Sequence, residues 1–167
     1  MSDIMLTTTT GTLVWLGGLG VHFKLYGGDT GEAFSIVEHP VGPGVLVPPH
    51  THTLEDEFSY VLEGEIGVRV GDREVHATPG CYIIKPRGIP HTFWNAGAKP
   101  ARLLEIISPA GFEKYFAEMS EVLRGDGPPD VEKIGEIASR YGLTYEMSWI
   151  AELVRKYNLN PPMSRGT

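Results

Sequence analysis

Between residues 12 and 108 the apolar residues come in short runs, and glycine or proline interrupts nearly every run. Runs of about four to eight residues bounded by such turn formers predict β-strands. The clearest turn is Gly71-Asp72, between GVRV and REVHA, because glycine in first place suits a two-residue hairpin. About ten strands with short connections predict an all-β fold, a small antiparallel β-barrel.

The pattern changes after residue 109, where apolar residues recur at three- and four-residue steps. This spacing marks one face of a helix and occurs in three segments, the last of which ends at NLNPP. Helices this short gain little stability alone, so we expect them to pack on the barrel or on a dimer partner. The sequence therefore predicts a β-barrel over residues 1–110 and a C-terminal helical extension over residues 111–160.

Composition excludes several classes of protein. A chain of 167 residues is the usual length of one domain, and its net charge of −7 argues against a nucleic-acid partner. Its apolar runs are far shorter than the roughly 20 residues of a membrane-spanning helix, and its N-terminus has no secretory signal pattern. We therefore expect a cytoplasmic protein. Cys81 is the only cysteine, which excludes an internal disulfide and a cysteine-rich zinc site.

A metal-binding pattern lies in residues 50–57, which read HTHTLEDE. His50 and His52 are two residues apart, so on a strand they point to the same face. Glu57 follows a short bend, and His91 comes from a later strand after a Pro-Gly turn. Three imidazoles and one carboxylate favour one divalent transition metal, with Fe, Ni or Mn expected first and Co, Cu or Zn as alternatives. Four protein ligands on a six-coordinate ion leave two open positions, as a catalytic site requires.

The four residues belong to two longer motifs. The first is G-x5-H-x-H-x4-E-x6-G, formed by Gly44, His50, His52, Glu57 and Gly64. The second is G-x5-P-x-G-x2-H-x3-N, formed by Gly80, Pro86, Gly88, His91 and Asn95. Both resemble the motifs of the cupin superfamily, which implies a jelly-roll β-barrel with a metal held by these histidines and Glu57. The segment ISPAGFEKYF adds a weaker resemblance to single-domain cupins described as quercetin 2,3-dioxygenase-like.

Three further residues are candidates for substrate binding. Ser59 is two residues after Glu57 and shares its face, and Phe93 shares a strand face with His91. Both are equally compatible with plain core packing. Glu105 interrupts the apolar strand RLLEIIS, so it either faces the cavity or points to solvent. If it lies inside, a partly buried carboxylate there can orient a ligand or accept a proton.

Other polar residues near the motifs have simpler interpretations. His22, His39 and His76 lie outside both motifs, and we expect them to be surface or turn histidines. Glu55 and Asp56 belong to the bend and should be solvated. Asn95 is expected to hold a loop by hydrogen bonds.

The resemblance to quercetin dioxygenase-like cupins implies a metal-dependent dioxygenase acting on a small enolisable or phenolic compound, with Glu57 also relaying the substrate proton. Two alternatives remain open: a lyase or isomerase that uses the ion as a Lewis acid, and a non-enzymatic small-ligand-binding cupin. The expected partner is a small-molecule substrate, with no nucleic acid and no membrane. We also expect a homodimer, because pairing would cover an exposed edge strand.

Overall fold

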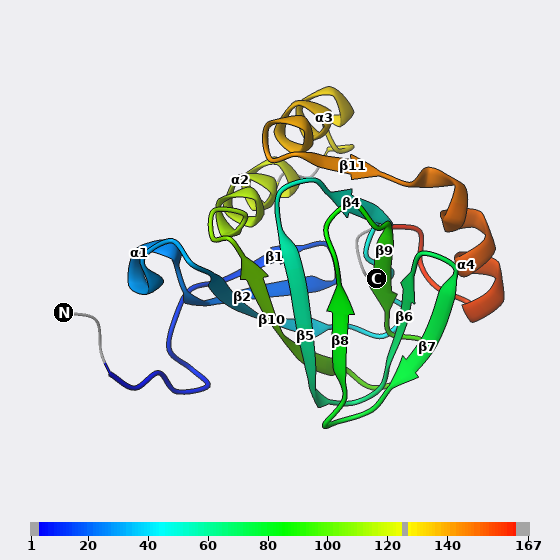
Figure 1. Ribbon diagram of the computed structural model, residues 1–167. Coiled ribbons are helices and arrows are strands. Elements are labelled where there is room, and N and C mark those ends of the chain that lie inside the picture. Colours follow the sequence, from blue (N-terminus) through cyan, green and yellow to red (C-terminus); the bar gives the residue numbers. More distant parts are fainter. Residues whose placement is uncertain (1–3, 125–126, 163–167) are drawn as a thin grey trace.

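Two antiparallel sheets form the body of the protein (Figure 1), as a computed structural model describes it for residues 4–124 and 127–162. The larger sheet has the order β1-β2-β3-β10-β5-β8. Its strands are β1 (Leu13–Leu16), β2 (Leu19–Leu25), β3 (Ser35–Val41), β10 (Ala101–Ser108), β5 (Asp56–Glu63) and β8 (Tyr82–Lys85). The smaller sheet has the order β11-β4-β9-β6-β7. Its strands are β11 (Leu143–Tyr145), β4 (His50–His52), β9 (His91–Trp94), β6 (Ile66–Val70) and β7 (Arg73–Ala77).

The strands bury alternate side chains, as half-buried strands do. In β10, every second residue from Ala101 to Ile107 is buried, and β3 shows the same alternation. These inward residues meet those of β6 and β9 in a core between the two sheets. The predicted all-β jelly-roll fold is confirmed, although the two sheets do not close into a strict barrel.

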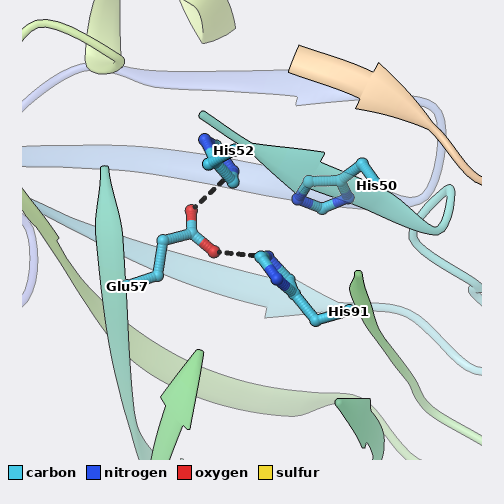
Figure 2. A group of neighbouring side chains, drawn as sticks. All are labelled: His50, His52, Glu57 and His91. Atoms are coloured by element: carbon cyan, nitrogen blue, oxygen red, sulfur yellow. Dashed lines mark hydrogen bonds and ion pairs between the residues drawn. The ribbon is translucent and has the colours of Figure 1, made fainter. Parts of the chain in front are cut away.

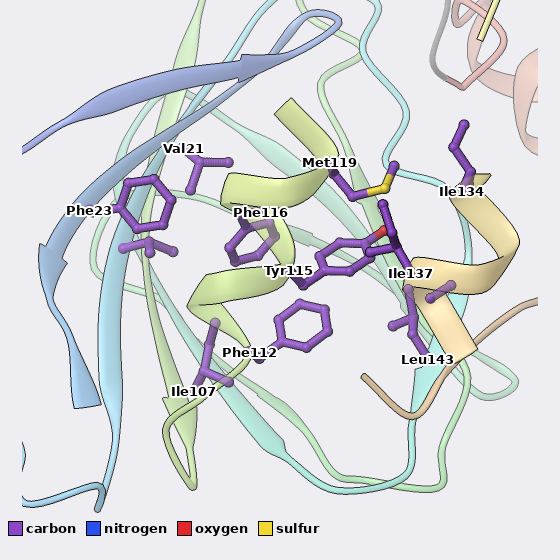
Figure 3. Packing of buried hydrophobic residues seen from close by; sticks show 12 residues of the cluster. Val21, Phe23, Ile107, Phe112, Tyr115, Phe116, Met119, Ile134, Ile137 and Leu143 are labelled. Carbon is purple, nitrogen blue, oxygen red and sulfur yellow. The ribbon is translucent and has the colours of Figure 1, made fainter. Parts of the chain in front are cut away.

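The C-terminal extension packs on this chain. Its helices are α2 (Glu113–Leu123), α3 (Val131–Arg140), the 3-10 turn η1 (Met147–Trp149) and α4 (Ile150–Tyr157), while a one-turn helix α1 (Gly27–Thr30) follows β2. The apolar face of α2 meets Val21 and Phe23 of β2 on one side, and Ile134 and Ile137 of α3 on the other (Figure 3). The predicted helical spacing is therefore satisfied by packing inside the molecule.

One element of the extension differs from the purely helical segment that the sequence suggested. Residues 143–145 form strand β11, which pairs antiparallel with β4 and places Leu143 opposite His52 and Tyr145 opposite His50. Three residues are too few to show an alternating pattern, so this strand has no signal in the sequence. The strand β11 is important for the site because it pairs with β4, which carries two candidate metal ligands.

Candidate metal centre

The two sequence motifs meet at a hydrogen-bonded turn before β9. Gly88 has a φ of +74°, a left-handed conformation that side-chain-bearing residues rarely adopt. Its N–H donates to the carbonyl of His52, with an N–O distance of 2.7 Å. In the adjacent ladder, His50 on β4 lies opposite His91 on β9. The turn therefore fixes His91 beside the two histidines of β4.

All four predicted ligands converge on one point. The candidate donor atoms of His50, His52, Glu57 and His91 lie within 4.8 Å of one another (Figure 2). The first two come from β4, Glu57 from β5 in the opposite sheet, and His91 from β9. Three of the side chains are buried and His50 is half-buried, so the cluster lies inside the fold.

Hydrogen bonds fix the orientation of each imidazole ring. Nδ1 of His50 lies 2.6 Å from the carbonyl oxygen of Pro48, and Nδ1 of His91 lies 3.0 Å from that of Ile89. Nδ1 of His52 lies 3.2 Å from a carboxylate oxygen of Glu55. Because carbonyl and carboxylate oxygens only accept, each Nδ1 carries a proton, which leaves Nε2 as the candidate metal-binding atom of each ring. Outer partners of this kind commonly orient metal-binding histidines.

The cluster meets the requirements of a divalent transition metal. Nε2 of His52 is buried without a hydrogen-bond partner among the described residues, although Oε1 of Glu57 lies 3.3 Å away. A buried nitrogen without a hydrogen-bond partner is costly unless something binds it. An ion at the centre would satisfy it, and three imidazoles with one carboxylate suit Fe, Mn, Co, Ni, Cu or Zn.

Charges around the cluster keep Glu57 ionised. Burial favours the neutral acid, yet Lys85 and His52 hold the pKa of Glu57 well below its usual range. Burial lowers the pKa of His50 far below normal, so this ring is neutral and able to bind a metal. Burial also opposes charge on His52, but the carboxylates of Glu57 and Glu55 outweigh it and raise the pKa to about 9. A metal must therefore displace a proton from His52.

A buried lysine, which sequence reasoning missed, connects the cluster to Glu105. The Nζ atom of Lys85 lies 2.9 Å from Oε2 of Glu57 and 2.8 Å from Oε2 of Glu105. The hydroxyl of Ser59 lies 3.1 and 3.0 Å from the two oxygens of Glu105. Burial raises the pKa of Glu105 to about 7, whereas Lys85 acts in the opposite direction. Of the three predicted substrate-binding residues, Glu105 is therefore buried inside the fold and Ser59 supports it.

Two residues of the surroundings were wrongly expected to be exposed. Glu55 is 5% exposed because it turns inward to hold His52, and His39 is 2% exposed on the inner face of β3. Both had signals in the sequence. Glu55 is three residues after His52, and His39 alternates with Val37 and Val41 on one face. Asn95, by contrast, holds its loop as predicted, donating to the carbonyls of Val41 and Lys99.

A largely apolar cavity of about 370 Å³ opens beside the ligand cluster. Its polar lining includes His50, Glu57 and Glu105, and its apolar wall includes Phe93, Phe112, Phe116 and Met119. Phe93, a candidate from the sequence for substrate binding, is thus one of the apolar residues that line this cavity. The volume lies in the range of small-molecule pockets and equals that of about a dozen water molecules.

A jelly roll with three histidines and a glutamate beside an internal cavity defines the class of protein, a β-sheet protein with a candidate metal site. Comparison with known families is consistent with this class, because residues 38–107 match the family model described as Cupin domain. The matched residues include all four candidate ligands. Among the described residues, no helix is long and apolar enough to span a membrane.

Similar proteins have varied names. The regulator "HTH-type transcriptional regulator PuuR" of Escherichia coli (strain K12) is 28% identical over 101 residues, which are 60% of this chain and 55% of that protein. The "Tetracenomycin polyketide synthase protein TcmJ" of Streptomyces glaucescens is 36% identical over 69 residues, or 41% of this chain and 46% of that protein. The chain thus spans about half the length of these relatives.

Among solved structures, the polyketide cyclase RemF of Streptomyces resistomycificus is 29% identical to this chain, with a TM-score of 0.56. The match covers 64% of this chain and 80% of RemF. The likeness thus includes the double-sheet fold and extends beyond the two motifs.

Proposed function

We propose that this protein is a metal-dependent enzyme acting on a small, largely apolar enol or phenol. The observation that carries the proposal is that two residues of the ligand cluster, His50 and Glu57, line the largely apolar 370 Å³ cavity. A substrate held against Phe93 and Phe112 would present one polar atom to the His50 and Glu57 end. Apolar walls with few polar groups are the usual design of a small-molecule site.

The side chains around the cluster have distinct roles in this proposal. His50, His52, Glu57 and His91 would hold the ion, and a bound divalent ion supplies positive charge that acidifies an enol or phenol hydroxyl. Lys85 keeps Glu57 ionised and fixes its carboxylate. Phe93 and Phe112 exclude water from the cavity, which strengthens the electrostatic interactions inside it.

Our first proposal for the reaction is dioxygenation, in which both atoms of O₂ enter the substrate. The test is oxygen uptake by protein loaded separately with Fe²⁺, Ni²⁺ or Mn²⁺, in the presence of a panel of flavonols. The His91→Ala variant treated with the same metal serves as the control for free ions. Uptake above that control supports dioxygenation, and its absence with every metal and flavonol contradicts it.

A second candidate is a Lewis-acid reaction without oxygen, such as a cyclisation, isomerisation or lyase step. The likeness to RemF and TcmJ favours it, because both names refer to polyketide chemistry. The test is exchange of the α-protons of 1-tetralone with deuterium, followed by NMR under argon with Zn²⁺-loaded protein. Exchange faster than with His91→Ala supports this candidate, and equal rates exclude enolisation of this ketone.

A ligand-binding role without turnover is a third candidate, supported by the likeness to the regulator PuuR. Binding of a cavity ligand by calorimetry, together with no oxygen uptake and no deuterium exchange, would favour it over both reactions.

A further inference from the structure

His39 is a buried histidine that the metal cluster does not use. It lies on the inner face of β3, where the ring is 5.9 Å from that of Phe93 and 5.5 Å from that of Phe116, centre to centre. The side chain is 2% exposed and borders the same cavity as Glu57 and Phe93. A polar ring among aromatic side chains needs a partner for each nitrogen.

Among the described residues, one nitrogen of this ring has a hydrogen-bond partner. Nδ1 of His39 lies 2.9 Å from the carbonyl oxygen of Gly20, which can only accept, so Nδ1 carries the proton. Nε2 is then a lone-pair acceptor, and it has no hydrogen-bond partner within the described ranges. Burial lowers the pKa of His39 to about 4, so the ring is neutral and accepts at neutral pH. The structure therefore leaves a hydrogen-bond acceptor on the cavity wall.

The sheet register places His39 away from the metal cluster. β10 lies between β5 and β3. Its residue opposite Glu57 of β5 is Ile107, and its residue opposite His39 of β3 is Leu103, which is four residues away along β10. β3 and β5 are separated by one strand, so the two backbone positions differ by roughly 10 Å across the sheet and roughly 13 Å along it. Glu105 lies between them on β10, and the three residues form a diagonal of polar groups.

The opposite wall of the cavity is aromatic along this diagonal. Phe93 comes from the facing sheet, two residues after His91, and its ring is near both His39 and Lys85, whose Nζ lies 5.3 Å from the ring centre. A flat ring system lying on Phe93 would therefore have the metal cluster at one end and Nε2 of His39 at the other.

We propose that His39 is a second substrate-binding residue, and that the substrate is an aromatic enol or phenol with a second hydroxyl remote from the first. The assignment rests on the proposed function, because the first oxygen is taken to face the His50 and Glu57 end. The second hydroxyl donates to Nε2 of His39. This selects dihydroxylated two-ring compounds over those with a single hydroxyl.

The test compares 1-naphthol with 1,5-, 1,6- and 1,7-dihydroxynaphthalene as probes of the Co²⁺-loaded protein under argon. Calorimetry measures affinity, and the visible spectrum of Co²⁺ reports whether an oxygen approaches the metal. We expect at least one diol to bind about 3- to 10-fold more tightly than 1-naphthol, the gain of one net hydrogen bond. Equal affinities of all four compounds would overturn the assignment.

Two variants separate binding from a structural role. His39→Asn keeps a donor for the carbonyl of Gly20 but loses the acceptor that faces the cavity, whereas His39→Gln extends an amide oxygen to the position of Nε2. The ratio of diol affinity to 1-naphthol affinity should fall to about one in H39N and should persist in H39Q. A loss of folded protein or of cavity shape weakens both compounds alike, so it cancels in this ratio. A ratio that persists in H39N, or that is lost in both variants, overturns the role of Nε2.

The two readouts keep the two proposals distinguishable. A diol preference without any change in the Co²⁺ spectrum supports the His39 subsite and contradicts the proposed function. A spectral change without diol preference supports the proposed function and contradicts the subsite. Failure of all four compounds to bind contradicts both.

Discussion

The segment that matches the cupin family and the C-terminal extension contribute different parts of the same site. Residues 38–107 supply every candidate metal ligand, together with Lys85 and Glu105. The extension supplies Phe116 and Met119 of the cavity wall. The first region thus supplies the candidate metal ligands and the buried polar contacts, and the second supplies part of the apolar wall beside them.

The two regions are nevertheless in contact at the ligands. β11 pairs with β4 along its three residues, and the ring of Phe112 lies 4.2 Å from that of His52 in an edge-on arrangement. The extension therefore both shapes the cavity and supports one side of the metal cluster. Variants in each region should separate metal binding from ligand binding.

The largest effect is expected on metal binding when a ligand is removed. His91→Ala deletes one of four donors, so stoichiometric binding of Co²⁺ should be lost. Glu55→Ala removes only the outer partner of His52 and should weaken binding by about 10- to 100-fold. Both are measured by Co²⁺ titration and by elemental analysis of the purified protein.

The matched control for these variants is His76→Ala, since His76 is an exposed residue of β7 outside the cluster. It should bind Co²⁺ like the unmodified protein. Full stoichiometric binding by His91→Ala would show that the four side chains do not form the metal site.

Lys85→Met should cause the next largest effect, a loss of stability. It leaves Glu57 and Glu105 without their shared cation, and breaking a buried ion pair from one side costs about 3 to 5 kcal/mol. Urea unfolding of the metal-free protein measures this. Adding Glu105→Leu to Lys85→Met should restore part of the loss, because one uncompensated carboxylate is removed. A cost below about 1 kcal/mol for Lys85→Met would contradict a buried, charged Lys85.

Met119→Ala tests whether the C-terminal extension contributes to ligand binding and not to metal binding. Met119 is fully buried and borders the cavity, so its truncation should lower the unfolding free energy by about 2 to 5 kcal/mol. It should also weaken 1-naphthol binding by about fivefold through lost apolar contact, as calorimetry would measure. Co²⁺ affinity should stay within about twofold. A parallel loss of Co²⁺ affinity would mean that the two regions are not separable.

The sequence allowed most of the fold and the ligand cluster to be predicted because both depend on local patterns. Short runs bounded by glycine predict strands, and the spacing of His50, His52, Glu57 and His91 is readable in one dimension. The helices of the extension were predicted for the same reason, since their apolar residues recur at helical spacing.

The remainder of the site depends on long-range pairing. Lys85 faces Glu57 only because β5 and β8 are neighbours with these residues in register. Its inward face cannot be inferred from YIIK, where both Tyr82–Ile84 and Ile83–Lys85 are possible inward pairs. The strand β11 was missed because three residues carry no periodicity. The lining of the cavity could not be predicted because it comes from segments that are distant in the sequence.

The smallest effect is a pH dependence that isolates His39 from the metal cluster. Burial lowers its pKa from 6.5 to about 4, with a smaller contribution from Lys85, which Glu57 and the hydrogen bond to Gly20 oppose. Between these two pH values the unfolded chain therefore binds more protons than the folded protein. The contribution of His39 to the unfolding free energy is thus full above pH 6.5 and is lost as the pH falls to about 4. It amounts to at most about 3 kcal/mol. In urea unfolding of the metal-free protein, the stability difference between the unmodified chain and His39→Asn should fall over this window. A difference that stays constant would mean that His39 is solvated in the folded protein, and the polar diagonal would then end at Glu105.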